Sequence, residues 1–202
     1  MSLSTTQAAK ELGVSARQVR RSAVSGRMVA TKYGASHVFS QRQVQAVERT
    51  AYRGRNWTKT TQQAALDLLS TGKTTELTGT ERSRLKHRIR GAAVGALAGQ
   101  ILRDRVSLRR AAGDEIKSHL ASVLTSELGL SAGGGLGVLV AQDASREARK
   151  ARLGLDDSGD IAVIEGDEVH RRVLEALALY MYGDARESSA AAGWIAAAQD
   201  AV

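Results

Sequence analysis

Aromatic side chains are so scarce in this sequence that they limit the kinds of core it can build. Phe, Trp and Tyr together make up 3% of the 202 residues, and Ala occupies many of the other apolar positions. A chain of this length can bury a substantial core. Leu, Val and Ile must therefore build that core on helices that pack closely through small residues. We expect a mainly α protein with small β elements, in two or three small domains.

Charge is distributed unevenly along the chain. Residues 1–110 contain 21 Lys and Arg against 6 Asp and Glu, whereas residues 111–202 contain 8 against 15. The first part thus carries a net charge of about +15 and the second about −7. Each phosphate that Lys or Arg neutralises releases condensed counterions, so we expect the basic part to bind a polyanion such as DNA.

The absence of Cys excludes disulfides and thiolate metal sites, and it is compatible with a reducing cytoplasm. The sequence shows neither a start that resembles a signal peptide nor an apolar stretch long enough to cross a bilayer. We expect a cytoplasmic, nucleoid-associated protein without a membrane partner.

The strongest local pattern is STTQAAKELGVSARQVRRSAVSGRM over residues 4–28. A hydroxyl side chain at residues 4–6 can cap a first helix that ends at Leu12, and Gly13 permits a tight turn. Ser15 then caps a second helix that runs to about Ser25. The pattern predicts a helix-turn-helix.

The second helix of this pair carries side chains suited to base edges. Its apolar positions share one face, and Arg17, Gln18 and Arg21 point away from that face. Arg can contact guanine through two hydrogen bonds, Gln can contact adenine in the same way, and Arg20 on the flank can bind a phosphate. The alternative is an amphipathic helix whose basic face is merely solvated.

A short hairpin is predicted next, because the β-favouring residues 28–33 and 37–39 flank Gly34. Ser40 then caps a further helix that continues to about Thr50. The apolar seam of this helix is Val44 and Val47, and the arginines expected outside are Arg42 and Arg49.

Residues 3–50 resemble the winged helix-turn-helix of the excisionase and MerR-type DNA-binding families. In those families the second helix enters the major groove and the wing meets the DNA backbone. The resemblance implies that Ser15 lies on base edges together with Arg17, Gln18 and Arg21. The implied wing contacts are Lys32, Tyr33 and His37.

A basic linker at residues 52–56 leads to a basic helical middle module. One helix is predicted over residues 58–70, and a second, ERSRLKHRIR, over residues 81–90. Leu85 and Ile89 are the only apolar anchors of the second helix. Its phosphate-binding candidates are Arg82, Arg84, Lys86, Arg88 and Arg90. A solvated, self-repelling helix is the alternative.

The sequence offers no convincing catalytic motif. STGKTT at residues 70–75 lacks both the earlier glycine and the leading strand of a nucleotide-binding P-loop. The four histidines are dispersed without ligand spacing. The carboxylates Asp156, Asp157, Asp160, Asp167 and Glu168 could hold a divalent ion, but we interpret them as solvated surface. We therefore expect no enzyme, no catalytic residue, no metal and no cofactor.

The acidic part is predicted to form a small α+β interaction domain. Its expected elements are a helix over residues 114–128, a central strand within residues 159–166 and two final helices over residues 169–181 and 186–198. The predicted division is a winged helix-turn-helix domain at 1–52, the basic module at 56–110 and the acidic domain at 111–202.

The whole chain resembles actinobacterial helix-turn-helix proteins encoded beside AbiEii/AbiGii-type nucleotidyltransferase toxins. The pieces that carry this resemblance are LSTTQAAKELGVSARQVRR, NWTKTTQQAALDLLSTGK with LTGTERSRLKHRIR, GDIAVIEG, and VLEALALYMYGDARESSAAAGW. It implies an antitoxin that represses its own operon and counteracts a nucleotidyltransferase toxin. The implied partners are double-stranded operator DNA, the cognate toxin and a second copy on DNA.

Two other classes of protein stay open. An excisionase-like DNA-binding regulator of a mobile element would use the same N-terminal half. A nucleic-acid-modifying enzyme would need the acidic cluster to bind a metal. The gene next to this one distinguishes the three: a nucleotidyltransferase, an integrase, or neither.

Overall fold

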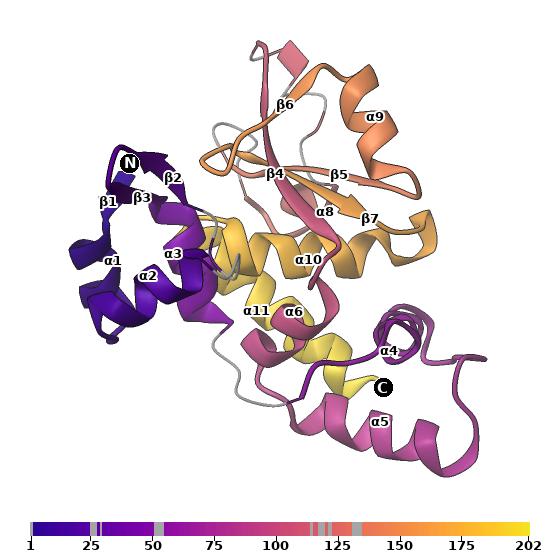
Figure 1. The fold of residues 1–202 in the computed structure, drawn as a ribbon. Coiled ribbons are helices and arrows are strands. Elements are labelled where there is room, and N and C mark those ends of the chain that lie inside the picture. Colours follow the sequence, from indigo (N-terminus) through magenta and orange to yellow (C-terminus); the bar gives the residue numbers. More distant parts are fainter. Residues whose placement is uncertain are drawn as a thin grey trace.

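The computed structural model describes residues 2–24, 28, 30–50, 55–113, 115–116, 120, 123–130 and 135–202. Over these residues the chain is mixed α/β and 57% helical, with ten α-helices and two small sheets (Figure 1). The predominance of helix and the small β elements agree with the composition.

The N-terminal elements form a three-stranded sheet against three helices. The elements are β1 (Ser2–Ser4), α1 (Thr5–Glu11), α2 (Ala16–Val24), β2 (Thr31–Tyr33), β3 (Ser36–Ser40) and α3 (Gln41–Arg49). The strand order is β1-β3-β2 and both pairings are antiparallel. The hairpin of β2 and β3 agrees with the sequence prediction, whereas β1 is an additional strand. Val19, Phe39 and Val44 are buried in the core of this unit.

A four-stranded sheet lies in the second half of the chain. Its strands are β4 (Val106–Ala111), β5 (Gly137–Ala141), β6 (Leu153–Leu155) and β7 (Ile161–Glu165), in the order β5-β7-β4-β6. Strand β7 is parallel to β5 and antiparallel to β4, and β4 is antiparallel to β6. The predicted central strand is confirmed, because β7 is an interior strand and its first four residues are buried on both faces.

Helix α10 is the centre of the molecule. The remaining helices are α4 (Lys59–Thr71), α5 (Gly79–Gly91), α6 (Val94–Ile101), α8 (Val123–Glu127), α9 (Ala144–Lys150), the short 3-10 helix η1 (Glu168–His170), α10 (Arg171–Tyr182) and α11 (Ala185–Asp200). Helix α10 lies between the larger sheet and the helices α4 and α6, and it also contacts α3 and α11 (Figure 1). The apolar side chains of Val173, Leu174, Leu177 and Met181 on α10 are buried.

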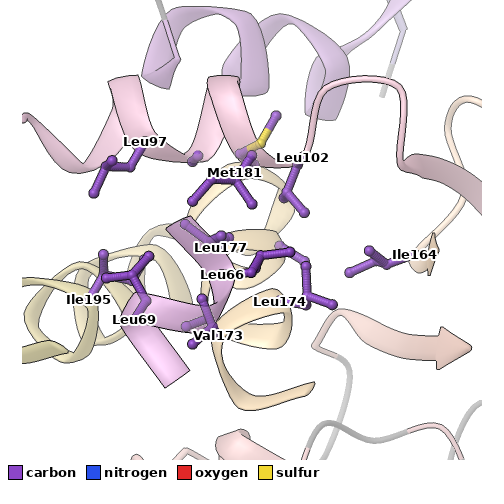
Figure 2. Packing of buried hydrophobic residues seen from close by; sticks show 14 of the residues in the cluster. Leu66, Leu69, Leu97, Leu102, Ile164, Val173, Leu174, Leu177, Met181 and Ile195 are labelled. Carbon is purple, nitrogen blue, oxygen red and sulfur yellow. The ribbon is translucent and has the colours of Figure 1, made fainter. Parts of the chain in front are cut away.

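One continuous core joins the middle of the chain to its end. Leu66 of α4, Leu97 of α6, Ile164 of β7, Leu174 of α10 and Ile195 of α11 belong to the same buried cluster (Figure 2). The boundary predicted at residue 110 therefore falls inside strand β4 and within a shared core.

The helix predicted over residues 114–128 is not continuous. Leu120 lies in a turn, and its carbonyl oxygen accepts a hydrogen bond from the main-chain N–H of Val138 at 2.9 Å. Helix α8 begins only at Val123. Residues 114, 117–119 and 121–122 of the predicted helix lie outside the described residues.

The prediction that Arg42 and Arg49 point to solvent is wrong. Arg49 Nη1 donates to the carbonyl oxygens of Tyr180 at 3.1 Å, Met181 at 3.1 Å and Gly183 at 2.8 Å. Arg42 Nη1 donates to the carbonyl oxygen of Gly159 at 3.1 Å. The polar face of α3 is therefore an internal interface that docks the N-terminal unit on the end of α10.

Helix α6 approaches the same interface closely because it carries a glycine there. A Cβ at Gly95 would overlap the carbonyl oxygen of Arg49, and it would lie 3.1 Å from the Tyr180 hydroxyl. That hydroxyl donates to the Arg49 carbonyl oxygen at 3.3 Å. Helices α3, α6 and α10 thus meet at one point, with Arg49 at its centre.

Candidate nucleic-acid interface

Local capping signals set the positions of α1 and α2. Ser4 caps α1 in a capping box with Gln7, as one of the three predicted hydroxyl caps. Gly13 adopts a left-handed conformation with φ of +62°, which allows the sharp turn between the helices. Val19 is buried in the N-terminal core, so the opposite face of α2 is directed outward.

Ser15 and Gln18, the two polar residues predicted to contact bases, form a capping box at the start of α2. Ser15 Oγ accepts from the Gln18 N–H at 3.3 Å, and Gln18 Oε1 accepts from the Ser15 N–H at 2.9 Å. The Ser-x-x-Gln spacing in the sequence is the signal that identifies this box. Contact of Ser15 and Gln18 with bases stays a prediction, and the capping box does not use the Nε2 group of Gln18, which can donate to a base.

The three arginines of α2 are exposed. Arg17, Arg20 and Arg21 lie on its outer surface, and none forms an ion pair with a carboxylate of the described residues. Their charges are therefore not neutralised within the part of the chain that the structure describes. Such a surface suits contact with phosphates and base edges.

The hairpin carries the three predicted wing residues. Lys32 of β2 and His37 of β3 are directly opposite each other in the sheet, so their side chains share a face. Tyr33 follows on the other face and is 67% exposed. Gly34, with φ of +59°, closes the turn. A hairpin tip with an exposed lysine and tyrosine can approach a DNA backbone.

Helix α5 is anchored on one side and basic on the other. Leu85 and Ile89 are buried as predicted. Gln199 of α11 fixes the end of α5, since its Nε2 donates to the carbonyl oxygens of Ile89 at 2.6 Å and Ala92 at 2.8 Å. The exposed arginines, again without an ion pair among the described residues, are Arg82, Arg84, Arg88 and Arg90.

Lys86 differs from the other predicted basic residues of α5. Its Nζ donates to the main-chain oxygen of Val202 at 2.8 Å and to that of Gly72 at 3.4 Å, and the residue is half-buried. No local pattern indicates these hydrogen bonds, because residues 72, 86 and 202 are far apart along the chain.

The structure places the candidate residues on two surfaces rather than one. Helix α2 and the hairpin belong to the N-terminal unit, whereas α5 lies beyond α6 and α11 in another part of the molecule (Figure 1). Because α3 docks on α10, the two basic surfaces are held in a fixed arrangement.

The acidic cluster is spread over separate internal contacts. Asp156 Oδ2 accepts from Arg110 Nε at 2.6 Å, and this bond and those from Ser158 lower the pKa of Asp156 to about 2. Burial raises the pKa of Asp157. Glu168 pairs with Arg171 at 3.2 Å. Among the residues described, no group of three or more His, Asp or Glu is arranged to hold a metal ion.

The loop that carries Asp156 and Asp157 also contacts the N-terminal unit. Ser40 Oγ donates to the carbonyl oxygen of Asp157 at 2.8 Å, close to the bond between Arg42 and Gly159. This part of the acidic cluster therefore has an internal partner, and its main chain helps to position α3.

A pair formed by the buried His170 and the partly buried Asp67 is a feature that the sequence patterns do not indicate. His170 Nε2 lies 2.9 Å from Asp67 Oδ1, and Thr74 Oγ1 donates to Asp67 Oδ2 at 2.7 Å. The pair joins η1 to α4 and leaves both groups engaged in internal contacts. It therefore contributes to the shared core rather than to either basic surface.

Comparison with protein-family models, curated proteins and solved structures found no match for this chain. No helix within the described ranges is long and apolar enough to cross a membrane. The function must therefore be argued from the two basic surfaces and their geometry.

Proposed function

We propose that this chain is a DNA-binding antitoxin and transcriptional autorepressor of a toxin–antitoxin operon, which counteracts a nucleotidyltransferase-type toxin. The observation that carries the DNA-binding part is the exposed face of α2, where Arg17 and Arg21 have no ion pair among the described residues. We interpret α1, α2 and the following hairpin as a winged helix-turn-helix. The antitoxin part rests on the resemblance of the whole chain to that family.

The second basic surface supports the proposal independently. Helix α5 is fixed at its buried side and at its C-terminal end, so its arginines project from a preorganised backbone. A preorganised cationic helix loses less conformational entropy when it binds phosphates. In this proposal α2 reads sequence and α5 adds affinity that is independent of sequence.

Sequence-specific binding is tested with the DNA upstream of the gene and a random duplex of equal length. Arg21→Ala should weaken operator binding by roughly 1–3 kcal/mol, and random DNA much less, if Arg21 contacts a base. Arg146→Ala on α9 removes an exposed arginine outside both basic surfaces and should change neither affinity. Equal weakening on both duplexes would reduce Arg21 to a phosphate contact.

Toxin counteraction is tested with the full chain. The double variant Arg17→Ala/Arg21→Ala should lose repression and still relieve the growth arrest caused by a neighbouring nucleotidyltransferase. Loss of both activities would instead favour an antitoxin that acts only through nucleic acid. An integrase gene in the neighbouring position would favour the excisionase-like alternative.

A further inference from the structure

The turn that connects α4 to α5 borders a polar cavity of about 420 Å³. It is lined by Gly72, Lys73, Gly79, Arg82, Ser83 and Lys86. Arg82, Ser83 and Lys86 follow Gly79 by three, four and seven residues. These four residues therefore lie on one face of α5, which is directed toward the turn. Among the described residues, the lining thus contains three cationic side chains and one hydroxyl group but no carboxylate side chain.

Lys86 is held in position at this cavity, because its Nζ donates hydrogen bonds to the main-chain oxygens of Gly72 and Val202. An ammonium group has three donors, so the two hydrogen bonds that Lys86 makes within the described residues leave one N–H for a ligand. Lys73 and Arg82 are exposed at the rim, and within the described part of the chain neither forms an ion pair.

The neighbouring Asp and Glu side chains of the described residues form no ion pair with Lys73 or Arg82. Glu76 and Glu81 are exposed and are not part of the lining. Asp67 is already engaged by His170 and Thr74 on the other side of the turn. Among the described residues of the lining, the positive charges of Lys73 and Arg82 therefore have no counterion, whereas Lys86 Nζ already lies 2.8 Å from a main-chain oxygen of Val202.

We propose that this cavity binds a phosphate group. A phosphate offers several acceptor oxygens, and charge-assisted hydrogen bonds from Lys and Arg together with the Ser83 hydroxyl suit it. The cavity is distinct from the outer basic face of α5, since Arg84 and Arg88 lie almost opposite to it around the helix. The proposal does not depend on DNA binding by α2, because a free phosphate ion can occupy the site.

The test titrates the isotope-labelled full chain with inorganic phosphate at constant ionic strength, and follows the amide signals of Gly72, Gly79 and Ser83 by NMR. We expect a saturable shift of these signals. Lys73→Gln/Arg82→Gln should weaken phosphate binding by about tenfold or more, because two charge-assisted hydrogen bonds can no longer form. Arg146→Gln/Arg149→Gln removes the same charge from α9, which lies outside both basic surfaces, and should leave the affinity of the cavity for phosphate unchanged.

A linear, unsaturable shift, or equal weakening in both double variants, would overturn the proposal. Unchanged spectra of the variants away from the cavity establish that both remain folded.

The source of the phosphate is then identified with duplexes that carry a 5′-phosphate or a 5′-hydroxyl. If Lys73→Gln/Arg82→Gln weakens binding of the 5′-phosphorylated duplex alone, the site binds a terminal phosphate. If it weakens binding of both duplexes equally, the site binds the phosphodiester backbone. Operator recognition through Arg21 is measured separately, so its failure would not be confused with failure of this site.

Discussion

The side chain of Arg49 connects α3 of the N-terminal unit to the end of α10. Its guanidinium supplies donors to carbonyl oxygens at the end of α10, which the helix itself leaves unsatisfied. Arg49→Gln should lower the free energy of unfolding by about 2–3 kcal/mol, because buried acceptors are then without a charged donor. Urea denaturation measures this decrease. Arg84→Gln, on an exposed arginine, should change stability by less than about 0.5 kcal/mol, and an equal effect of both would contradict the role of Arg49.

The ion pair of Arg110 and Asp156 predicts that the stability of the fold depends on pH. The folded-state pKa of Asp156, about 2, lies below its ordinary 3.8, so the pair stabilises the fold above that range and this contribution disappears as the pH falls toward 2. Arg110→Gln should move the pKa of Asp156 from about 2 toward 3.8. NMR titration of the carboxyl groups measures the pKa of Asp156. The control variant Arg146→Gln should leave this pKa at about 2. A pKa that stays low in Arg110→Gln would assign the shift to Ser158.

Sequence reasoning could not separate the arginines of α3 from those of α2. In both helices Arg occupies the polar face of an amphipathic pattern, yet Arg49 is covered and Arg17 is exposed. The partners of Arg49 are more than 130 residues away. Periodicity identifies which face is polar, but it does not say whether water or a second part of the chain covers that face.

At the scale of elements, the close contact of α6 with the end of α3 requires that residue 95 have no side chain. Gly95→Ala should destabilise the protein by about 1–3 kcal/mol, because the new Cβ would push α6 away from the Arg49 carbonyl. Gly193→Ala in α11 meets no neighbour and should stabilise by about 0.5–1 kcal/mol through reduced backbone freedom. Thermal unfolding of both variants measures the contrast. A neutral or stabilising effect of Gly95→Ala would show that packing at Gly95 is not limiting.

The exposed arginines of α5 lead to a prediction about how DNA binding depends on salt concentration. Replacing Arg84, Arg88 and Arg90 by Gln should reduce the slope of log K against log salt by about 0.9 for each phosphate that is no longer neutralised. Binding to a random duplex at several salt concentrations measures the slope. A matched control replaces Arg146, Arg149 and Lys150 of α9, which removes the same charge from another helix. An equal change in the control would attribute the effect to net charge alone.

Local signals predicted most helix boundaries in this chain. Ser40 caps α3 as expected, because N-capping depends only on neighbouring residues. The helix predicted from Thr58 begins one residue later, with Thr58 as its N-cap. The break at Leu120 escaped prediction, since it depends on a hydrogen bond to Val138 in a distant strand. The same limit explains why β1 was missed, as it is a three-residue strand that exists only by pairing with β3.

At the scale of the whole molecule, the shared core sets the smallest stable fragment. Residues 111–202 include β5, β7, α10 and α11, but they lack the side chains of α4 and α6 that cover α10. A fragment of residues 111–202 should therefore be largely unfolded, whereas residues 56–202 should unfold cooperatively. Circular dichroism melting distinguishes the two. Cooperative melting of the shorter fragment would instead support the boundary predicted at residue 110.

Helix α3 has Val44 in one core and Ala46 in the other. This shared helix has a genetic consequence if α2 binds the operator. A screen for derepressed mutants would recover substitutions at Ala46, Arg49 and Gly95, none of which lies on the DNA-facing surface, beside substitutions at Arg17. Expression level and melting temperature would separate the two groups, because the first disturbs the orientation of α2 within the molecule and the second removes only a side chain that touches DNA.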